Sequence, residues 1–182
     1  LPVQGDEARA ILELIKEKES QGFQYEGAEA SFELLLRRGR AGYQSPFELV
    51  DFRVLVEKRH RPPQAPSSEE VLAEATVKVK VDGETVLTAA EGNGPVNALD
   101  AALRKALIQF YPQLSAIKLV DYKVRIIDEA SGTGAKVRVL IESTDGHLLW
   151  RTMGSSANII EASWLALADS LEYWLLRNPR SY

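Results

Sequence analysis

The order of predicted elements repeats once along this 182-residue chain, and the repeat constrains the fold more than any other feature. Segments of alternating polarity at 47–60 and 114–128 each precede a hairpin, and a predicted helix follows each hairpin. The hairpins contain Asp82-Gly83 and Asp145-Gly146, 63 residues apart. Asp-Gly between alternating runs is the strongest short hairpin signal. Each half therefore predicts a β-β-β-α unit.

We therefore expect an α+β fold of two pseudo-twofold-related β-β-β-α units, with two three-stranded antiparallel sheets each backed by a helix. Repeat 1 would span residues 46–112 and repeat 2 residues 113–182, together forming one regulatory domain of 46–182. Two short predicted helices precede them and are too small to form their own core. Residues 1–45 are therefore expected to be a helical linker arm that packs on something else. The proline-rich segment 61–69 predicts a linker that cannot pair in a sheet.

Composition excludes several classes of function. The net charge is −4 and no block of basic residues stands out, so nucleic acid is not an expected partner. Apolar runs fall short of the ~20 residues of a membrane span. The absence of cysteine excludes disulfides and fits a cytoplasmic location. The chain begins at Leu1 and its only methionine is Met153, so we expect a fragment of a longer polypeptide.

The last predicted helix is apolar nearly all the way round, which predicts burial on more than one side. Its own sheet would cover one side. A second subunit is the favoured cover for the other side, which predicts a homodimer. The alternative is that the first two helices fold back onto it.

Motifs of catalysis are missing. The segment from Gly92 to Asn97 lacks the third glycine of a dinucleotide fingerprint, and there is no Walker loop. The two histidines, His60 and His147, have no ligand spacing around them that suggests a metal. No serine occupies a nucleophile elbow. The sequence as it stands does not predict a catalyst.

The two predicted helix starts remain as candidate sites. Glycines, Gly92 and Gly154, open both helix entries about one repeat apart. Backbone N–H groups at Gly92-Asn93-Gly94 and hydroxyls at Ser155-Ser156 could receive an anion, and the alternative is simple capping, in which these groups satisfy one another or bind water. The functional interpretation is a small carboxylate ligand with a branched aliphatic group, surrounded by Val96, Tyr122, Ile126, Val137 and Ile159.

Four segments carry a family resemblance: GFQYEGAEASFELLLRR, EGNGPVNALDAALRKAL, LVDYKVRIID and SSANIIEASWLALADSL. Together they resemble the C-terminal portion of the 2-isopropylmalate synthase and citramalate synthase family, over essentially the whole chain. The segment from Gly22 to Arg38 is similar to the citramalate synthase branch in particular. The resemblance implies a regulatory domain that pairs across a dimer and binds a branched-chain amino acid as feedback inhibitor.

The resemblance also implies a parent enzyme. Its catalytic (β/α)₈ barrel, dependent on a divalent metal, would condense acetyl-CoA with pyruvate in isoleucine biosynthesis. This chain lacks that barrel and is expected to be inactive and to hold no cofactor itself. Isoleucine is the favoured effector. The alternatives are a leucine-binding domain of a 2-isopropylmalate synthase, or a dimerisation module that binds no ligand.

The effector-binding residues that the resemblance implies come from both repeats. They are Gly92, Gly94, Val96 and Asn97 at the first helix entry, Leu119, Tyr122, Ile126, Thr133 and Val137 around the strands of repeat 2, and Ala157 and Ile159 at the second helix entry. Relatives commonly have Asp at position 97, and Asn lacks the charge to pair with an ammonium group. Leu119 has the opposite parity to Tyr122, so it can face the same pocket only if the strand begins irregularly.

Overall fold

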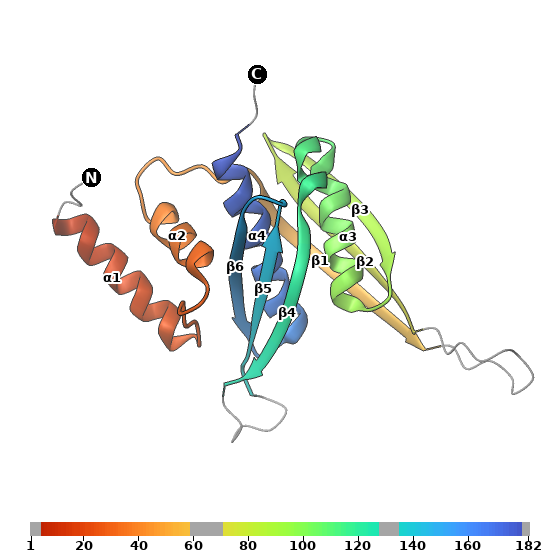
Figure 1. The fold of residues 1–182 in the computed structure, drawn as a ribbon, viewed down its shortest axis with the longest axis horizontal. Helices are drawn as coiled ribbons and strands as arrows, with labels where there is room; N and C mark the ends of the chain where they lie inside the picture. Colours follow the sequence, from red (N-terminus) through yellow and green to blue (C-terminus); the bar gives the residue numbers. More distant parts are fainter. Residues whose placement is uncertain (1–4, 59–70, 128–134, 180–182) are drawn as a thin grey trace, which may run out of the picture. The chain divides into compact units, whose positions relative to one another are not determined.

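The chain divides into two compact units in a computed structural model that describes residues 5–58, 71–127 and 135–179 (Figure 1). Unit 1 comprises residues 1–46 and 116–182, and unit 2 comprises residues 47–115. Unit 2 nearly coincides with the predicted first repeat, while the N-terminal arm belongs to the same unit as the second repeat. The predicted proline-rich linker lies outside the described residues.

Unit 2 contains the first β-β-β-α repeat. Strands β1 (Glu48–Lys58), β2 (Val71–Val81) and β3 (Glu84–Gly92) form an antiparallel sheet, sheet A, in that order. Helix α3 (Pro95–Ile108) packs on one face of the sheet. Alternate residues of β2 are buried because β2 is central and α3 covers one of its faces. The buried core of the unit includes Ala75, Val77, Val79, Leu99, Leu103 and Leu107.

Unit 1 contains the second repeat. A short 3₁₀ helix, η1 (Pro112–Ala116), leads to β4 (Lys118–Ile126), β5 (Val137–Thr144) and β6 (Leu149–Ser156), which form the antiparallel sheet B. Helix α4 (Ile159–Arg177) packs on β5 and β6. Two three-stranded antiparallel sheets, each packed on a helix, confirm the predicted fold class. None of the helices in the described residues is long and apolar enough to span a bilayer.

The two repeats share one hydrogen-bond register. From β2 to α3, residues correspond to those 64 positions later, so Thr88 corresponds to Thr152. Each of these threonines donates its hydroxyl to a helix carbonyl, Ala102 or Ala166, at 2.7 Å. The Asp-Gly pairs, 63 residues apart in sequence, are therefore displaced by one position relative to each other in the structure.

The first strand of each repeat begins with the same irregularity. The pairing shifts between Leu49 and Asp51 in β1 and between Leu119 and Asp121 in β4. The extra residue in β4 is Val120. One inserted residue reverses the side-chain alternation, so Leu119 lies on the same face of sheet B as Tyr122. The structure thus contains the irregular strand start that a common orientation of these two residues requires.

The two hairpin turns differ in geometry. Asp82 and Gly83 both have positive φ, 49° and 85°, as a two-residue type I′ turn requires. The second hairpin instead has four residues between Thr144 and Leu149. There the Asp145 carboxylate accepts hydrogen bonds from the backbone N–H of His147 and Leu148, at 2.9 and 2.7 Å. Both predicted hairpins are thus present, but only the first has a two-residue Asp-Gly turn.

The Asp145 carboxylate makes the free energy of unfolding depend on pH in the acidic range. Hydrogen bonds from the Leu148 N–H, the Trp174 indole and the His147 N–H lower the pKa of Asp145 to about 2. Because the folded-state pKa is below the unfolded value of about 3.9, this contribution is present above pH ~4 and is lost as pH falls towards 2. We expect the free energy of unfolding, measured with urea at pH 5, 3 and 2, to fall less with decreasing pH for Asp145→Asn than for the wild type. Equal losses would contradict this assignment.

The N-terminal arm packs on the second repeat. It contains α1 (Gly5–Ser20) and α2 (Glu29–Arg38), and α2 contacts both α4 and β6 (Figure 1). The Ser31 hydroxyl accepts the Met153 N–H of the outer strand β6 at 3.0 Å and donates to Asp169 of α4 at 2.6 Å. The arm thus protects the sheet edge. It also covers α4 as the fold-back alternative expected, so the all-round apolar helix does not by itself require a second subunit.

Candidate effector-binding site

The expected effector site divides into two half-sites, because its residues belong to both compact units. Gly92, Gly94, Val96 and Asn97 lie in unit 2. The others lie in unit 1, and Thr133 is outside the described residues.

The half-site in unit 2 is the start of α3. Gly94 is the N-cap, in an extended conformation with φ −175°, and no side chain caps the helix there. Pro95 follows at the first helical position and has no N–H to donate. The N–H groups of Val96 and Asn97 therefore stand at the helix start without a side-chain cap. Such donors, at the positive end of the helix dipole, favour a carboxylate.

The other polar group of this turn already has a partner. The side-chain oxygen of Asn97 accepts the backbone N–H of Asn93 at 3.2 Å. The carboxamide therefore stabilises the turn between β3 and α3. Its NH₂ group is a donor and cannot receive an ammonium group.

The two glycines of this turn have different roles. A Cβ on Gly92 would lie 2.5 Å from the backbone nitrogen of Ala98, so close packing of strand against helix excludes a side chain there. A Cβ on Gly94 would meet nothing within 4 Å. Gly92 is thus explained by packing alone, whereas nothing in the described part of the chain requires glycine at position 94.

The start of α4 is a closed cap. Asn158 is the N-cap, and its side chain accepts the N–H of Ile160 at 2.8 Å and of Glu161 at 3.4 Å. Ser156 accepts the Asn158 N–H and donates to Glu161, while Ser155 donates to the Gln21 carbonyl. These hydroxyls are engaged within the fold, as the capping alternative expected. The two helix starts differ because their N-cap residues differ. Asn158 caps α4 with its side chain, whereas Gly94, at the corresponding position of repeat 1, has no side chain to cap α3.

Gly92 and Gly154, expected at equivalent helix entries, are not equivalent. Gly92 is the last residue of β3, whereas Gly154 lies within β6, two residues before its end. In the shared register, Gly154 corresponds to Ala90. Glycine spacing alone could not distinguish these positions.

The half-site in unit 1 lies on the face of sheet B that α4 packs against. Tyr122 and Ile126 of β4 share this face, and Ile126 pairs directly with Val137 of β5. The Tyr122 hydroxyl lies 2.8 Å from the Ser163 hydroxyl of α4. Because Ser163 gives its hydrogen to the Ile159 carbonyl at 2.7 Å, Tyr122 donates to Ser163. This hydrogen bond fixes the Tyr122 ring against the N-terminal part of α4.

Part of this face is open to solvent. Ile126 is 59% exposed and Ile159, the first residue of α4, is 42% exposed. Val137 and Leu119 are half-buried and Ala157 is exposed. The structure thus brings Tyr122, Ile126 and Val137 together on one apolar surface beside the start of α4.

Sequence reasoning missed two residues of these half-sites. Ser163 positions Tyr122, and its place in the second turn of a long apolar helix gave no signal of that role. Asn158 closes the second helix start. An Asn immediately before a periodic apolar segment is a recognised N-cap signal that could have revealed it.

The two β-β-β-α units thus present a helix start with uncapped backbone donors in unit 2 and an apolar strand face in unit 1. The chain matches the family model of the LeuA allosteric (dimerisation) domain over residues 26–175 and belongs to that family. This confirms the expected membership of the 2-isopropylmalate synthase and citramalate synthase family.

Curated relatives agree with this assignment. The chain is 54% identical over 165 residues to an (R)-citramalate synthase of Geobacter sulfurreducens, covering 91% of this chain and 30% of that protein. It is 51% identical over 172 residues to an (R)-citramalate synthase of Aquifex aeolicus, covering 94% and 31%. It is 32% identical over 114 residues to a 2-isopropylmalate synthase of Aquifex aeolicus, covering 63% and 20%. The chain thus spans under a third of the length of these relatives.

Proposed function

We propose that this chain is the feedback-regulatory domain of a citramalate synthase that condenses acetyl-CoA with pyruvate, and that it binds isoleucine. The observation that carries this proposal is the contrast in similarity between the two kinds of relative. Identity is 54% to a citramalate synthase over most of the chain, but 32% over 63% of it to a 2-isopropylmalate synthase. A leucine-binding domain of a 2-isopropylmalate synthase is the alternative.

The rest of the parent enzyme would supply the chemistry. A catalytic barrel with a divalent metal would carry out the condensation in the cytoplasm, while this chain, tested alone, would release no CoA from acetyl-CoA and pyruvate. Because an allosteric ligand acts only through a difference in its affinity for two states, its binding here must favour a less active state of the enzyme.

The start of α3 and the apolar face of sheet B each offer a kind of contact that an amino acid can use. The uncapped N–H groups at the start of α3 favour the carboxylate. The face formed by Tyr122, Ile126 and Val137 offers apolar surface to a branched aliphatic group. Since the Asn97 oxygen is engaged by Asn93, we assign the ammonium group to a backbone carbonyl.

Isoleucine should raise the melting temperature of the chain by several degrees. A ligand at 100 times its dissociation constant stabilises the folded state by ~2.7 kcal/mol. Leucine and valine should bind more weakly, although one methylene discriminates by only ~1–3 kcal/mol. Tyr122→Ala should abolish the shift, whereas Lys123→Ala, the next residue on the opposite face of β4, should retain it. If calorimetry detects no binding of any of the three at millimolar concentration, the module binds no branched-chain amino acid.

Gly94→Ala separates ligand binding from folding. Because a Cβ at this position meets open space and the backbone is extended, the variant should fold with wild-type stability. Loss of isoleucine binding in this folded variant would support close approach of a carboxylate to the α3 start. Unchanged affinity would remove the α3 start from the site.

We also propose a homodimer, which the family description as a dimerisation domain supports. Light scattering at tens of micromolar should give twice the chain mass. A strictly monomeric species would contradict the proposal.

A further inference from the structure

A hollow of about 460 Å³ lies on the face of sheet B that points away from Tyr122, and four cationic side chains meet there. Lys123 and Arg125 come from β4, Arg138 from β5 and Arg151 from β6. Residues of the arm and Leu140 complete the lining, of which Glu26 is the one acidic member. The hollow is therefore strongly cationic in a chain whose net charge is −4.

Two of the four cations are without a carboxylate partner among the described residues. Lys123 pairs with Asp121, and Arg151 pairs with Glu142, each at 2.5 Å. Arg125 and Arg138 instead stand directly opposite each other in the β4–β5 register. Like charges in that position destabilise a sheet.

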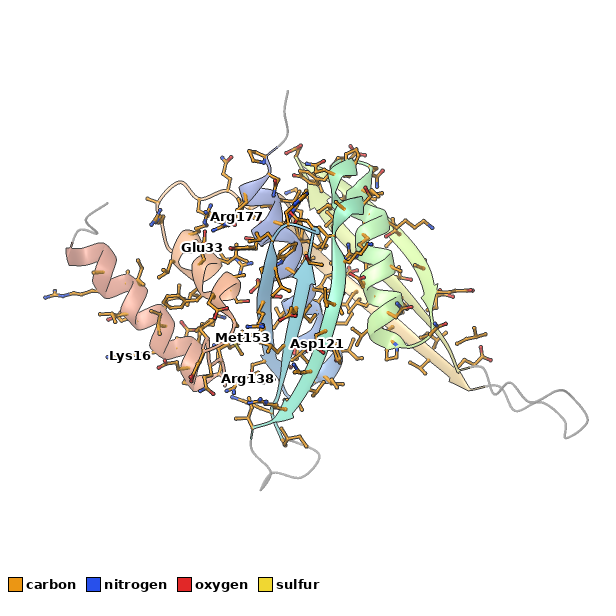
Figure 2. The ribbon with its side chains drawn as sticks, viewed as in Figure 1. Lys16, Glu33, Asp121, Arg138, Met153 and Arg177 are labelled. Atoms are coloured by element: carbon orange, nitrogen blue, oxygen red, sulfur yellow. The ribbon has the colours of Figure 1, made fainter. Side chains whose placement is uncertain are left out.

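Arg138, labelled in Figure 2, has its guanidinium held in place by hydrogen bonds to uncharged groups. Its Nε and Nη2 donate to the Gly22 carbonyl at 3.1 and 2.8 Å, and Nη1 donates to the Gln24 side-chain oxygen at 2.9 Å. These acceptors carry no net charge. Burial, and then the charge of Arg125, lower the pKa of Arg138. A bound anion would remove this repulsion.

Anchoring the end of α1 accounts for the position of Arg138, since cations favour helix C-termini. It does not account for Arg125, which faces Arg138 and makes no contact of that kind with the described residues. The guanidinium groups of Arg125 and Arg138 thus lie side by side, and the acceptors that hold Arg138 carry no charge. In a hollow large enough for a small molecule, such a pair can bind the oxygen atoms of an anion.

We propose that this hollow binds a small multivalent oxyanion, either a phosphate ester or a polycarboxylate, with Arg125 and Arg138 as its direct contacts. Lys123 and Arg151 can turn to the ligand because exposed ion pairs such as theirs contribute little. The site is independent of the proposed effector, since β4 presents Tyr122 on one face of sheet B and Arg125 on the other.

Titration calorimetry with pyrophosphate and with citrate, at constant ionic strength, tests this site. We expect saturable binding of one anion per chain. Arg125→Gln should weaken the affinity for the anion by about tenfold or more, because it removes a charge-assisted hydrogen bond. Arg53→Gln, on the corresponding strand of the other repeat, should leave it unchanged. Arg125→Gln should melt no lower than the wild type, because it removes a like-charge contact.

The two probes distinguish the sources of the anion. Tighter binding of pyrophosphate indicates a phosphate ester, and tighter binding of citrate indicates a polycarboxylate. The proposal is overturned if neither anion binds saturably at millimolar concentration, or if Arg125→Gln binds as well as the wild type. Retained isoleucine binding in Arg125→Gln would show that the two sites are separate.

Discussion

Replacing Gly154 with alanine should destabilise the chain by about 3 kcal/mol or more, a large part of the free energy of unfolding of an ordinary domain. Gly154 lies on the face of β6 against which α4 packs. A Cβ built there would be 2.0 Å from the carbonyl oxygen of Ala162 and 2.9 Å from its carbonyl carbon. Because both atoms belong to the helix backbone, no side-chain rotation can relieve the overlap. Helix α4 must move away from sheet B.

Gly94→Ala is the matched control, since it adds the same methyl group in open space. Urea unfolding monitored by circular dichroism should show a lower midpoint for Gly154→Ala and no change for Gly94→Ala. The slope of free energy against urea should be unchanged if the fold is retained. A Gly154→Ala midpoint within error of the wild type would mean that α4 does not pack as closely as the structure shows.

The sequence predicted the fold because its strongest signals are local. Two-residue periodicity and Asp-Gly turns define strands and hairpins within short windows, and their repetition defines the architecture. The same signals could not predict which residues of the two repeats correspond in the hydrogen-bond register. The Asp145 carboxylate can hold a four-residue loop, and this displaces the turn by one position.

The candidate site was only partly accessible from sequence. Parity of side chains along β4 predicted a common face for Tyr122 and Ile126, and it identified the irregularity that Leu119 would need. The roles of Gly92 and Gly154 were not accessible, because both are set by the distance between a helix and a strand. Tertiary distances of that kind leave no periodic signal.

The buried ion pairs of the arm were also missed. Charged residues usually lie on solvated faces, yet Asp169 and Glu172 of the apolar helix α4 are only 9% and 4% exposed. Their partner is Arg38, which belongs to α2, more than 130 residues away in sequence. A pairing over that separation has no local pattern.

Arg38 joins the arm to α4. Its Nη2 lies 2.7 Å from an oxygen of Asp169 and 2.7 Å from an oxygen of Glu172, and its Nε donates to Glu172 at 3.1 Å. Ser31 donates to Asp169 and Tyr43 donates to Glu172. Both carboxylates thus depend on groups supplied by the arm.

Ionisation of this cluster depends on the arm as well. Burial raises the pKa of Asp169, although the charge of Arg38 opposes the shift. Burial also lowers the pKa of Arg38, but the charge of Asp169 and the hydrogen bond to Glu172 outweigh it and raise that pKa overall. Removing the guanidinium would therefore leave two buried carboxylates side by side, and the pKa of Asp169 would rise further.

Arg38→Met, which keeps the length of the side chain but not its charge, should destabilise the chain strongly at pH 7. Breaking a buried ion pair costs ~3–5 kcal/mol, and because the Arg38 side chain is 38% exposed we expect the lower end, about 3 kcal/mol. The neighbouring Arg37→Met removes a helical i,i+4 pair with Glu33 and should cost only ~0.3–0.5 kcal/mol. Urea unfolding of both variants measures the difference.

The stability lost in Arg38→Met relative to the wild type should also decrease as the pH is lowered. A carboxyl group whose folded-state pKa lies above its unfolded value disfavours folding when ionised, and the penalty disappears as pH falls below the unfolded pKa, ~3.9 for Asp. The stability lost in Arg38→Met should therefore shrink between pH 7 and pH 4, while limited proteolysis at pH 7 should cleave the arm faster than in Arg37→Met. A deficit that is the same at both pH values, or no larger than that of Arg37→Met, would show that Arg38 does not hold the arm through these carboxylates.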